Sequence, residues 1–384
     1  MAANTLLAGL IPFGLAYPIA LSDARLVASG HQVASTFYPL GYVAFLVGPL
    51  FLGGINGVLI AQTLAYACYV VLCYAALRTK LSPLRCAIGT TLAALLPQSV
   101  VAIRHIGDAA LTFPLLVAAV ASIAWLRREG YSSTRTICLA VSFGWLITVR
   151  TNAYALVVFV VIALWYVMPV RGWLILVLGT ISSIVLVTTP IHGRPLFIST
   201  NGPYTFFIGA NPFSEEALLC CYSAESSVAV APDTPGPMLE ANPWIDLRDN
   251  SQLLHLGLQY VREHPGDFVR LGGVKLFTLA RPYLFEQGRI QTIFEIVQVL
   301  PLAAWVAFRL LWRRRYGLLP AGLMYLLVVL YIAPFLVTNA EPRFRYPLDA
   351  ILLLDVWCLV CGRWPGRDGG ALRLASLGGL RSAR

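Results

Sequence analysis

The sequence predicts an all-α polytopic membrane protein with about ten transmembrane helices, interfacial helices and one long extracytoplasmic loop. Hydrophobic residues make up 58% of the 384 residues and charged residues only 12%, whereas a soluble domain is about 25% charged. The mean hydropathy is +0.74. Apolar runs separated by short polar turns recur along the chain, and many approach the ~20 residues that a helix needs to cross a bilayer. Together these observations exclude an ordinary soluble core.

The apolar runs define the candidate spans in chain order. They are residues 5–21, 55–77, 86–103, 109–126, 136–149, 154–168, 173–191, 292–311, 318–337 and 348–362. A further run at 43–52 is too short to cross the hydrocarbon core and ends at Gly53-Gly54, so we expect a surface-lying or re-entrant helix there.

The basic residues predict the orientation. If the N-terminus is cytoplasmic and the spans alternate, the short inner loops hold more than half of the 28 Lys and Arg residues, as the positive-inside rule requires. We therefore expect a multi-pass protein of the cell (inner, cytoplasmic) membrane with both termini in the cytoplasm. The net charge of +10 then reflects orientation and anionic lipid rather than nucleic acid.

Four parts follow from this topology. They are an N-terminal transmembrane module (1–191), an extracytoplasmic loop with interfacial helices (192–291), C-terminal transmembrane helices (292–363) and a disordered cytoplasmic tail (364–384). Within the loop, turn-forming residues flank a short β-like aromatic stretch at 204–208, and the Pro- and Ser-rich segment 214–243 is expected to be mobile. An amphipathic helix beginning after Asp246 and a helix in the headgroup plane at 268–285 follow.

One turn carries three ionisable side chains between two spans: Arg104-His105-Ile106-Gly107-Asp108. Charge at such a position is costly unless it meets water, a cavity or a partner. Asp108 and Asp23, at the first two outer turns, are candidate catalytic carboxylates. Either one can act as a general base that removes a proton from an acceptor attacking a sugar carbon.

Cations at the same level suggest a phosphate site. Arg104, Arg150, Lys275, Arg343 and Arg345 all fall on the outer side, and the Arg-x-Arg pair offers forked donors to a phosphate. The alternative is that these side chains are interfacial anchors that extend to the headgroups, and this holds for Arg150 in particular.

Several common catalytic classes lack their motifs. The sequence has no P-loop, no GxGxxG after a strand, no HExxH and no GxSxG. No set of metal ligands stands out, and dependence on a divalent metal is left open.

Loose motifs along nearly the whole chain resemble the C-type (GT-C) membrane glycosyltransferases. The branch is the one with the dolichyl-phosphate-mannose protein mannosyltransferases, the aminoarabinose transferase and the RgtA/B/C/D-like enzymes. The residues that carry the resemblance are Ala28-Ser29-Gly30, Tyr38-Pro39-Leu40-Gly41-Tyr42, Asp108 through Pro114, Arg150, Ser199-Thr200-Asn201-Gly202 to Gly209-Ala210-Asn211-Pro212, and Pro342-Arg343-Phe344-Arg345-Tyr346-Pro347.

The resemblance implies a polyprenyl-phosphate sugar as the donor substrate and a glycan, lipid or protein as the acceptor. Transfer would take place on the extracytoplasmic face with inversion at the sugar carbon. The family's first-loop acid would fall near Ala16-Tyr17, which is not acidic, and Asp23 is the nearest carboxylate. We thus expect Asp23 as base and Asp108 as a group that orients the acceptor or supports the base. The expected substrate-binding residues are Arg104, His105, Arg150, Asn201, Tyr204, Asn211, Lys275, Arg343 and Arg345.

Two alternatives stay open at this point. A flippase or transporter of lipid-linked sugars would place charges at mid-membrane, and Asp355 and Glu295 are candidates for such charges. An inactive homologue of the same fold is the second alternative, because the early acid is missing.

Overall fold

The computed structural model confirms the all-α class. It describes residues 14–15, 18–33, 40–103, 105–197, 202–221, 229–231, 234–247, 249–281, 289–311, 317–341 and 344–361. Three of the described helices are long and apolar enough to cross a membrane: α3 (Leu40–Arg78), α6 (Ala109–Glu129) and α9 (Val170–His192). The chain is a helical membrane protein.

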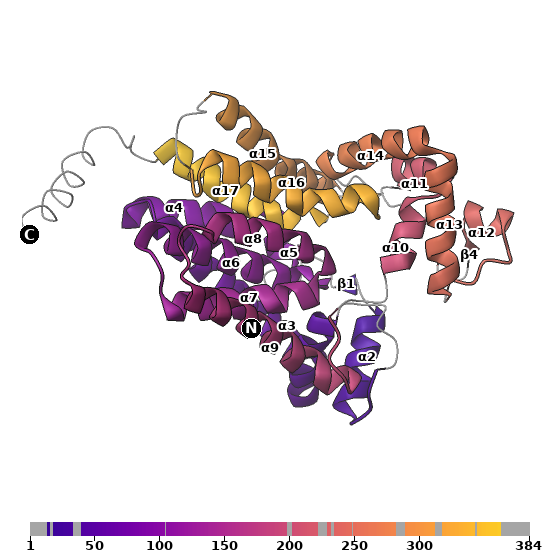
Figure 1. Ribbon diagram of the computed structural model, residues 1–384, viewed down its shortest axis with the longest axis horizontal. Helices are drawn as coiled ribbons and strands as arrows, with labels where there is room; N and C mark the ends of the chain where they lie inside the picture. The colour runs from indigo at the N-terminus through magenta and orange to yellow at the C-terminus, as the bar shows by residue number, and fades with distance from the viewer. Residues whose placement is uncertain are drawn as a thin grey trace, which may run out of the picture.

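Shorter apolar helices complete the bundle around these three (Figure 1). They are α7 (Ser133–Val149), α8 (Leu156–Leu164) after the 3-10 turn η1 (Thr151–Ala155), α15 (Arg289–Leu311), α16 (Ala321–Val337) and α17 (Tyr346–Cys361). Helices α3, α6, α7 and α9 pack on one another, and α17 packs on α15 and α6. One large apolar core joins most of these helices.

Glycine and proline interrupt two of the predicted segments. Within α3, Gly53 and Gly54 have non-helical backbone angles, and Gly54 has a φ of +57° that side chains other than glycine's disfavour. The helix that contains the run 43–52 is therefore kinked at this pair. A second helical part, which is the predicted span 55–77, follows directly after the kink. The predicted span 86–103 is two helices, α4 (Pro83–Ala94) and α5 (Pro97–Val101), because Pro97 cannot donate a helical hydrogen bond.

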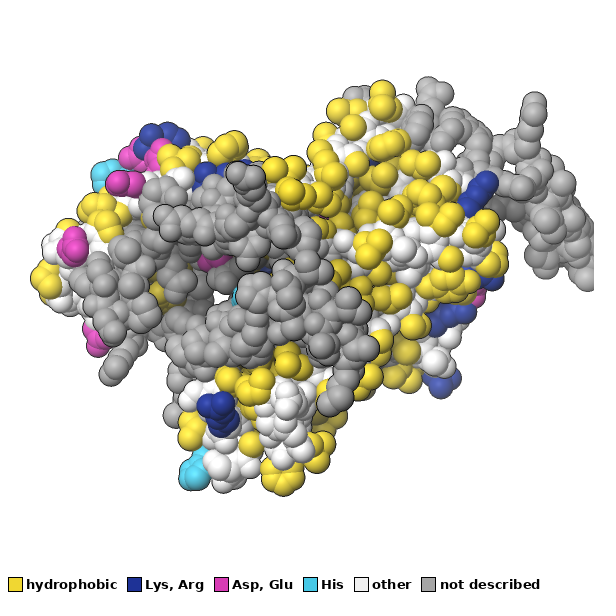
Figure 2. Space-filling model, turned by 180° about the vertical axis from the view of Figure 1, so that it is seen from behind, with side chains coloured by type: hydrophobic (Ala, Val, Ile, Leu, Met, Phe, Trp, Pro, Cys, Tyr) yellow, Lys and Arg dark blue, Asp and Glu magenta, His cyan; other side chains and the backbone are white. Residues whose placement is uncertain are grey.

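A lobe of short elements stands at the end of the bundle opposite the last turn of α17 (Figure 1). It contains α10 (Gly202–Gly209), α11 (Ser214–Cys221), β3 (Ala229–Ala231), β4 (Thr234–Pro235), α12 (Pro237–Ala241), α13 (Asn250–Glu263) and α14 (Pro265–Ala280). Acidic side chains are seen mainly on this lobe, while apolar ones cover much of the bundle (Figure 2).

Two expectations for this lobe are wrong. The aromatic stretch at 204–208 is helical, because Pro203 favours a first helical turn and Tyr204, Phe207 and Ile208 form one face that packs against Leu253. Helix α11, the strands and α12 also order most of the described part of 214–243, which was expected to be a mobile loop. The amphipathic helix after Asp246 is confirmed as α13.

A second apolar cluster holds helix α2 against the bundle. Helix α2 (Pro18–Ala28) contributes Ala20 and Ala24, and these pack with Ile106, Val149 and the first turns of α3. Strand β1 (Gly14–Leu15) pairs in parallel with β2 (His105–Ile106). Strand β1 is thus placed beside His105 and Ile106 of the charged turn.

Candidate functional site

Asp108 and Arg150 form an ion pair at the end of the bundle that carries α2. The Nε of Arg150 donates to Oδ2 of Asp108 at 2.7 Å, and the two side chains are only 9% and 15% exposed. Asp108 immediately precedes α6, and Arg150 immediately follows α7. Because the guanidinium is covered and paired, the interpretation of Arg150 as an interfacial anchor is wrong.

A third part of the chain closes over this pair. Nη1 of Arg150 donates to the carbonyl of Phe344 at 3.4 Å, and its guanidinium lies 5.4 Å from the centre of the Phe344 ring. Tyr331 on α16 donates its hydroxyl to the same carbonyl at 3.1 Å. The Phe344 ring stacks on Phe335 at 5.0 Å. The segment before α17 is therefore fixed at the Asp108–Arg150 pair.

Arg345 points inward and is 1% exposed. Its Nε donates to both carboxylate oxygens of Asp349, at 2.9 and 3.1 Å, and its Nη1 donates to the carbonyl of Leu279. Gln298 donates to Asp349 at 3.0 Å from α15. The remaining nitrogen of Arg345, Nη2, is buried and has no hydrogen-bond partner in the described part of the chain. The N–H groups of this nitrogen are therefore enclosed in the protein and are not open to a ligand in this structure.

Gln62 holds the charged turn in place from α3. Its Nε2 donates to the carbonyls of Ala102 and His105, at 2.6 and 3.0 Å, and its side chain is 1% exposed. His105 itself lies in β2 and pairs with Gly14. Sequence reasoning missed Gln62, although an amide inside the apolar run 55–77 was a detectable signal.

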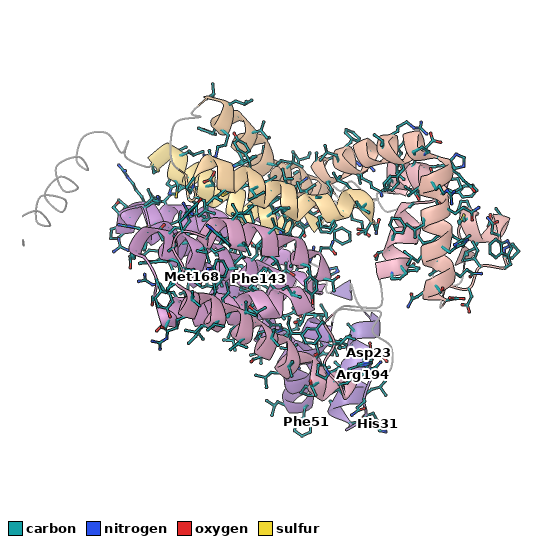
Figure 3. All side chains as sticks on the ribbon, viewed as in Figure 1. Asp23, His31, Phe51, Phe143, Met168 and Arg194 are labelled. Atoms are coloured by element: carbon teal, nitrogen blue, oxygen red, sulfur yellow. The ribbon has the colours of Figure 1, made fainter. Side chains whose placement is uncertain are left out.

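Asp23 lies half-buried on α2, between Ala20 and Ala24 of the second cluster. It makes no hydrogen bond or ion pair with any other residue that the structure describes, and burial raises the pKa of its carboxyl above the ordinary 3.8. Figure 3 shows it with Arg194 and His31 at one end of the molecule. The β1–β2 pairing brings α2 to the same end as Asp108, but the two carboxylates do not bond each other.

Lys275 is fully buried and braces the lobe against the bundle. Its Nζ donates to the carbonyls of Gly209 at 2.7 Å and Leu336 at 3.1 Å. Both carbonyls lie in the last turns of their helices, α10 and α16, where the helix itself supplies no donor. The ammonium group therefore caps two helix ends. We therefore assign Lys275 a structural role in place of phosphate binding.

This brace makes the fold sensitive to pH. Burial lowers the pKa of Lys275 from 10.5 to about 7. Between pH 7 and 10.5 the unfolded chain therefore binds more protons than the folded one, and folding stability rises with pH by up to about 1.4 kcal/mol per unit. Below pH 7 Lys275 is charged in both the folded and the unfolded chain, so burial of its ammonium group lowers folding stability by the full amount.

We expect the unfolding midpoint of the detergent-solubilised protein to rise between pH 7 and pH 9 relative to that of Lys275→Met, because the variant lacks the titrating group. Thermal unfolding of both proteins at each pH measures the difference. Parallel curves for the two proteins would contradict this assignment.

The other predicted residues divide into two groups. Asn211 is buried; its Nδ2 donates to the carbonyls of Phe207 and Ile208, and its Oδ1 accepts from the amide of Phe213. Asn211 thus caps the end of α10, and Tyr204 is buried in the core of the lobe. We therefore include neither residue in the candidate site. Arg104, Asn201 and Arg343 lie outside the described residues.

One of the two intramembrane acids lies in an ion pair. Asp355 on α17 is completely buried and bonds Arg309 on α15, and the side chain of Glu295 lies outside the described set. No group of three or more His, Cys, Asp or Glu side chains in the described ranges is placed to hold a metal ion.

Comparison with known proteins gives one likeness to report. No model of a protein family matches the chain, and no curated protein sequence matches it. Among solved structures, the chain is similar to ArnT from Cupriavidus metallidurans bound to undecaprenyl phosphate, with 14% identity and a TM-score of 0.40. The alignment covers 93% of this chain and 75% of that one.

Proposed function

We propose that the chain is an integral membrane glycosyltransferase of the GT-C type that moves a sugar from a polyprenyl-phosphate donor to an extracytoplasmic acceptor. The observation that carries the proposal is the meeting of Asp108, Arg150, Phe344 and Arg345. They come from three distant parts of the chain and meet at one end of the bundle.

Each group has a chemical task in this proposal. Asp23 takes the proton of the acceptor hydroxyl or amine, whose oxygen or nitrogen attacks the sugar carbon as the bond to phosphate breaks. The electron pair of that bond leaves with the polyprenyl phosphate. Arg343 and Arg104, the sequence neighbours of Phe344 and His105, would neutralise the developing phosphate charge. Arg345 is buried and paired with Asp349, and Asp108 and Arg150 fix the position of the Phe344 segment that follows Arg343.

The direct test uses purified protein with a set of polyprenyl phosphates that carry different hexoses and pentoses. A transferase releases free polyprenyl phosphate and a glycosylated acceptor, both of which mass spectrometry detects. A flippase, in contrast, moves labelled lipid across vesicles and leaves it intact. Intact donors under every acceptor condition would overturn the proposal.

The Asp108–Arg150 pair provides a second readout in the same assay. Asp108→Asn and Arg150→Gln should each lower turnover by about 10²-fold, since a displacement of about 1 Å in a positioning element has this effect. Each single variant also leaves a buried group without its partner, so its unfolding midpoint should fall.

The double variant Asp108→Asn with Arg150→Gln is the control. Two neutral side chains remain, so its unfolding midpoint should recover part of the loss, while turnover should stay low. Full turnover in the double variant would show that the pair has only a structural role.

A further inference from the structure

A groove of about 700 Å³ is hollowed between α3, α6 and α7. On α6 its wall is formed by Leu115, Ala118, Ser122 and Trp125, which recur at the three- and four-residue spacing of one helix face. The hollow arises because two small side chains lie between two large ones. Helices α3 and α7 supply the other walls, and these walls are almost wholly apolar.

A cationic group stands at one mouth of this groove. The guanidinium of Arg135, at the start of α7, lies 4.7 Å from the centre of the Trp125 ring and pairs with Glu129 at 2.5 Å. The Trp125 ring is fixed in turn, because its Nε1 donates to the carbonyl of Ala75 at 3.2 Å. Arg135 is still 33% exposed, and a guanidinium has five N–H donors. It can therefore donate hydrogen bonds to a second anion besides Glu129.

Two further arginines lie at the same end of α6, outside the groove wall. Arg128 donates to the carbonyl of Arg78 at 3.4 Å, and Arg127 donates to the carbonyl of Ala163. Arg127 and Arg128 occupy the last turn of α6, where cations are favoured by the helix dipole. This end of the groove therefore carries more positive than negative charge.

We propose that the groove binds one acyl chain of an anionic glycerophospholipid, with the lipid phosphate at Arg135. The wall on α6 runs from Leu111 to Trp125, a rise of about 21 Å at 1.5 Å per residue. One leaflet of the hydrocarbon core is about half of 30 Å thick. The groove is thus long enough for a complete acyl chain of the leaflet at the Arg135 end.

The position of the cation distinguishes this lipid from the donor of the proposed glycosyl transfer. Asp108 and Trp125 lie at opposite ends of α6, about 25 Å apart along its axis. A donor whose phosphate lay at the Asp108 end of α6 could not place the same phosphate at Arg135. The inference is therefore independent of the proposed function.

The test uses protein in phosphatidylcholine vesicles that contain a small fraction of photoactivatable phosphatidylglycerol. The expected cross-links map to the groove walls, which include the exposed Cys68 and Cys138. Arg135→Gln should lower phosphatidylglycerol cross-linking about fivefold, as expected for one basic residue near an anionic surface. It should leave labelling by a photoactivatable phosphatidylcholine unchanged.

Ala118→Phe should abolish labelling by both lipids, because it fills the hollow. Ser182→Phe is the matched control, since Ser182 is exposed on α9 away from the groove, and its labelling should equal that of the unchanged protein. If Ala118→Phe does not fold, Arg135→Gln alone decides.

Three results would overturn the proposal. The first is that phosphatidylglycerol and phosphatidylcholine label the unchanged protein equally near Arg135. The second is that Arg135→Gln does not lower phosphatidylglycerol cross-linking, and the third is that polyprenyl phosphate displaces phosphatidylglycerol from the groove.

Discussion

Asp23→Asn is expected to lower the turnover number by about 10²–10⁴-fold, the usual range for loss of a general base, without loss of membrane insertion. Asp23 is half-buried and forms no ion pair or hydrogen bond among the described residues. A carboxylate of this kind keeps its lone pairs available for a proton from the acceptor. Asn has the same size but cannot accept that proton at neutral pH.

The pH profile adds a second measurement for the same residue. Burial raises the pKa of Asp23 above 3.8, and the base is active only when ionised. Activity should therefore be present above the raised pKa and fall as pH decreases through it. The acid limb of kcat/KM should then begin at a higher pH than for an exposed aspartate.

Asp249→Asn is the matched control for Asp23→Asn. Asp249 is exposed and caps α13 by accepting from the amides of Ser251 and Gln252, and asparagine caps a helix equally well. Its turnover and pH profile should not change. Full activity of Asp23→Asn would remove Asp23 from the catalytic role and favour an inactive or differently organised site.

Local sequence signals predicted the long helices α3, α6 and α9, because an apolar run near 20 residues has few other folds in a membrane. The predicted span 5–21 is wrong as a continuous helix, because it contains β1 and the start of α2. Local signals also identified Asp108, since charge beside a span needs a partner. The identity of that partner could not be read locally. Arg150 lies on the far side of two helices, and only the packing of α6 on α7 brings it within 2.7 Å.

The prediction that Lys275 binds phosphate disagrees with its position on the helix, which indicates a buried side chain. It lies four residues after Leu271 and four before Leu279, and all three side chains are buried. This spacing places Lys275 on the inner face of α14 rather than at the headgroups. The prediction weighed its charge and ignored its helical phase.

Close backbone approach is a further feature that sequence alone did not reveal. A Cβ at Gly41 would lie 2.3 Å from Oγ1 of Thr148, so glycine is required where α3 begins against the end of α7. Trp145 donates to the carbonyl of the same glycine at 3.1 Å. The glycine of the Tyr38–Tyr42 motif thus sets the position of the α7 end that precedes Arg150.

The second large effect is expected from the buried pair between α15 and α17. Asp355 accepts at Oδ2 from Nε of Arg309 at 3.0 Å, from its Nη2 at 2.5 Å and from Nε1 of Trp305 at 2.9 Å. Its Oδ1 accepts from the amide of Leu318 at 2.6 Å. A Cβ at Gly317 would lie 1.9 Å from Oδ1, so the loop before α16 is fitted tightly to this carboxylate.

Asp355→Asn should destabilise the fold by about 3–5 kcal/mol, because it leaves the guanidinium of Arg309 buried without a counter-charge. Arg309→Met should cost a similar amount for the opposite reason. The double variant Arg309→Met with Asp355→Leu removes both charges and should recover part of the loss. Recovery should be incomplete, because the Trp305 and Leu318 donors lose their acceptor.

Resistance of the detergent-solubilised protein to heat or to SDS measures these differences, and glycosyl transfer is assayed in parallel. A structural pair predicts that turnover of the double variant follows its folded fraction. If the double variant folded fully but lost movement of lipid-linked sugar across vesicles, Asp355 would be a transport residue. Because both side chains are at most 1% exposed and each bonds the other, we expect the structural outcome.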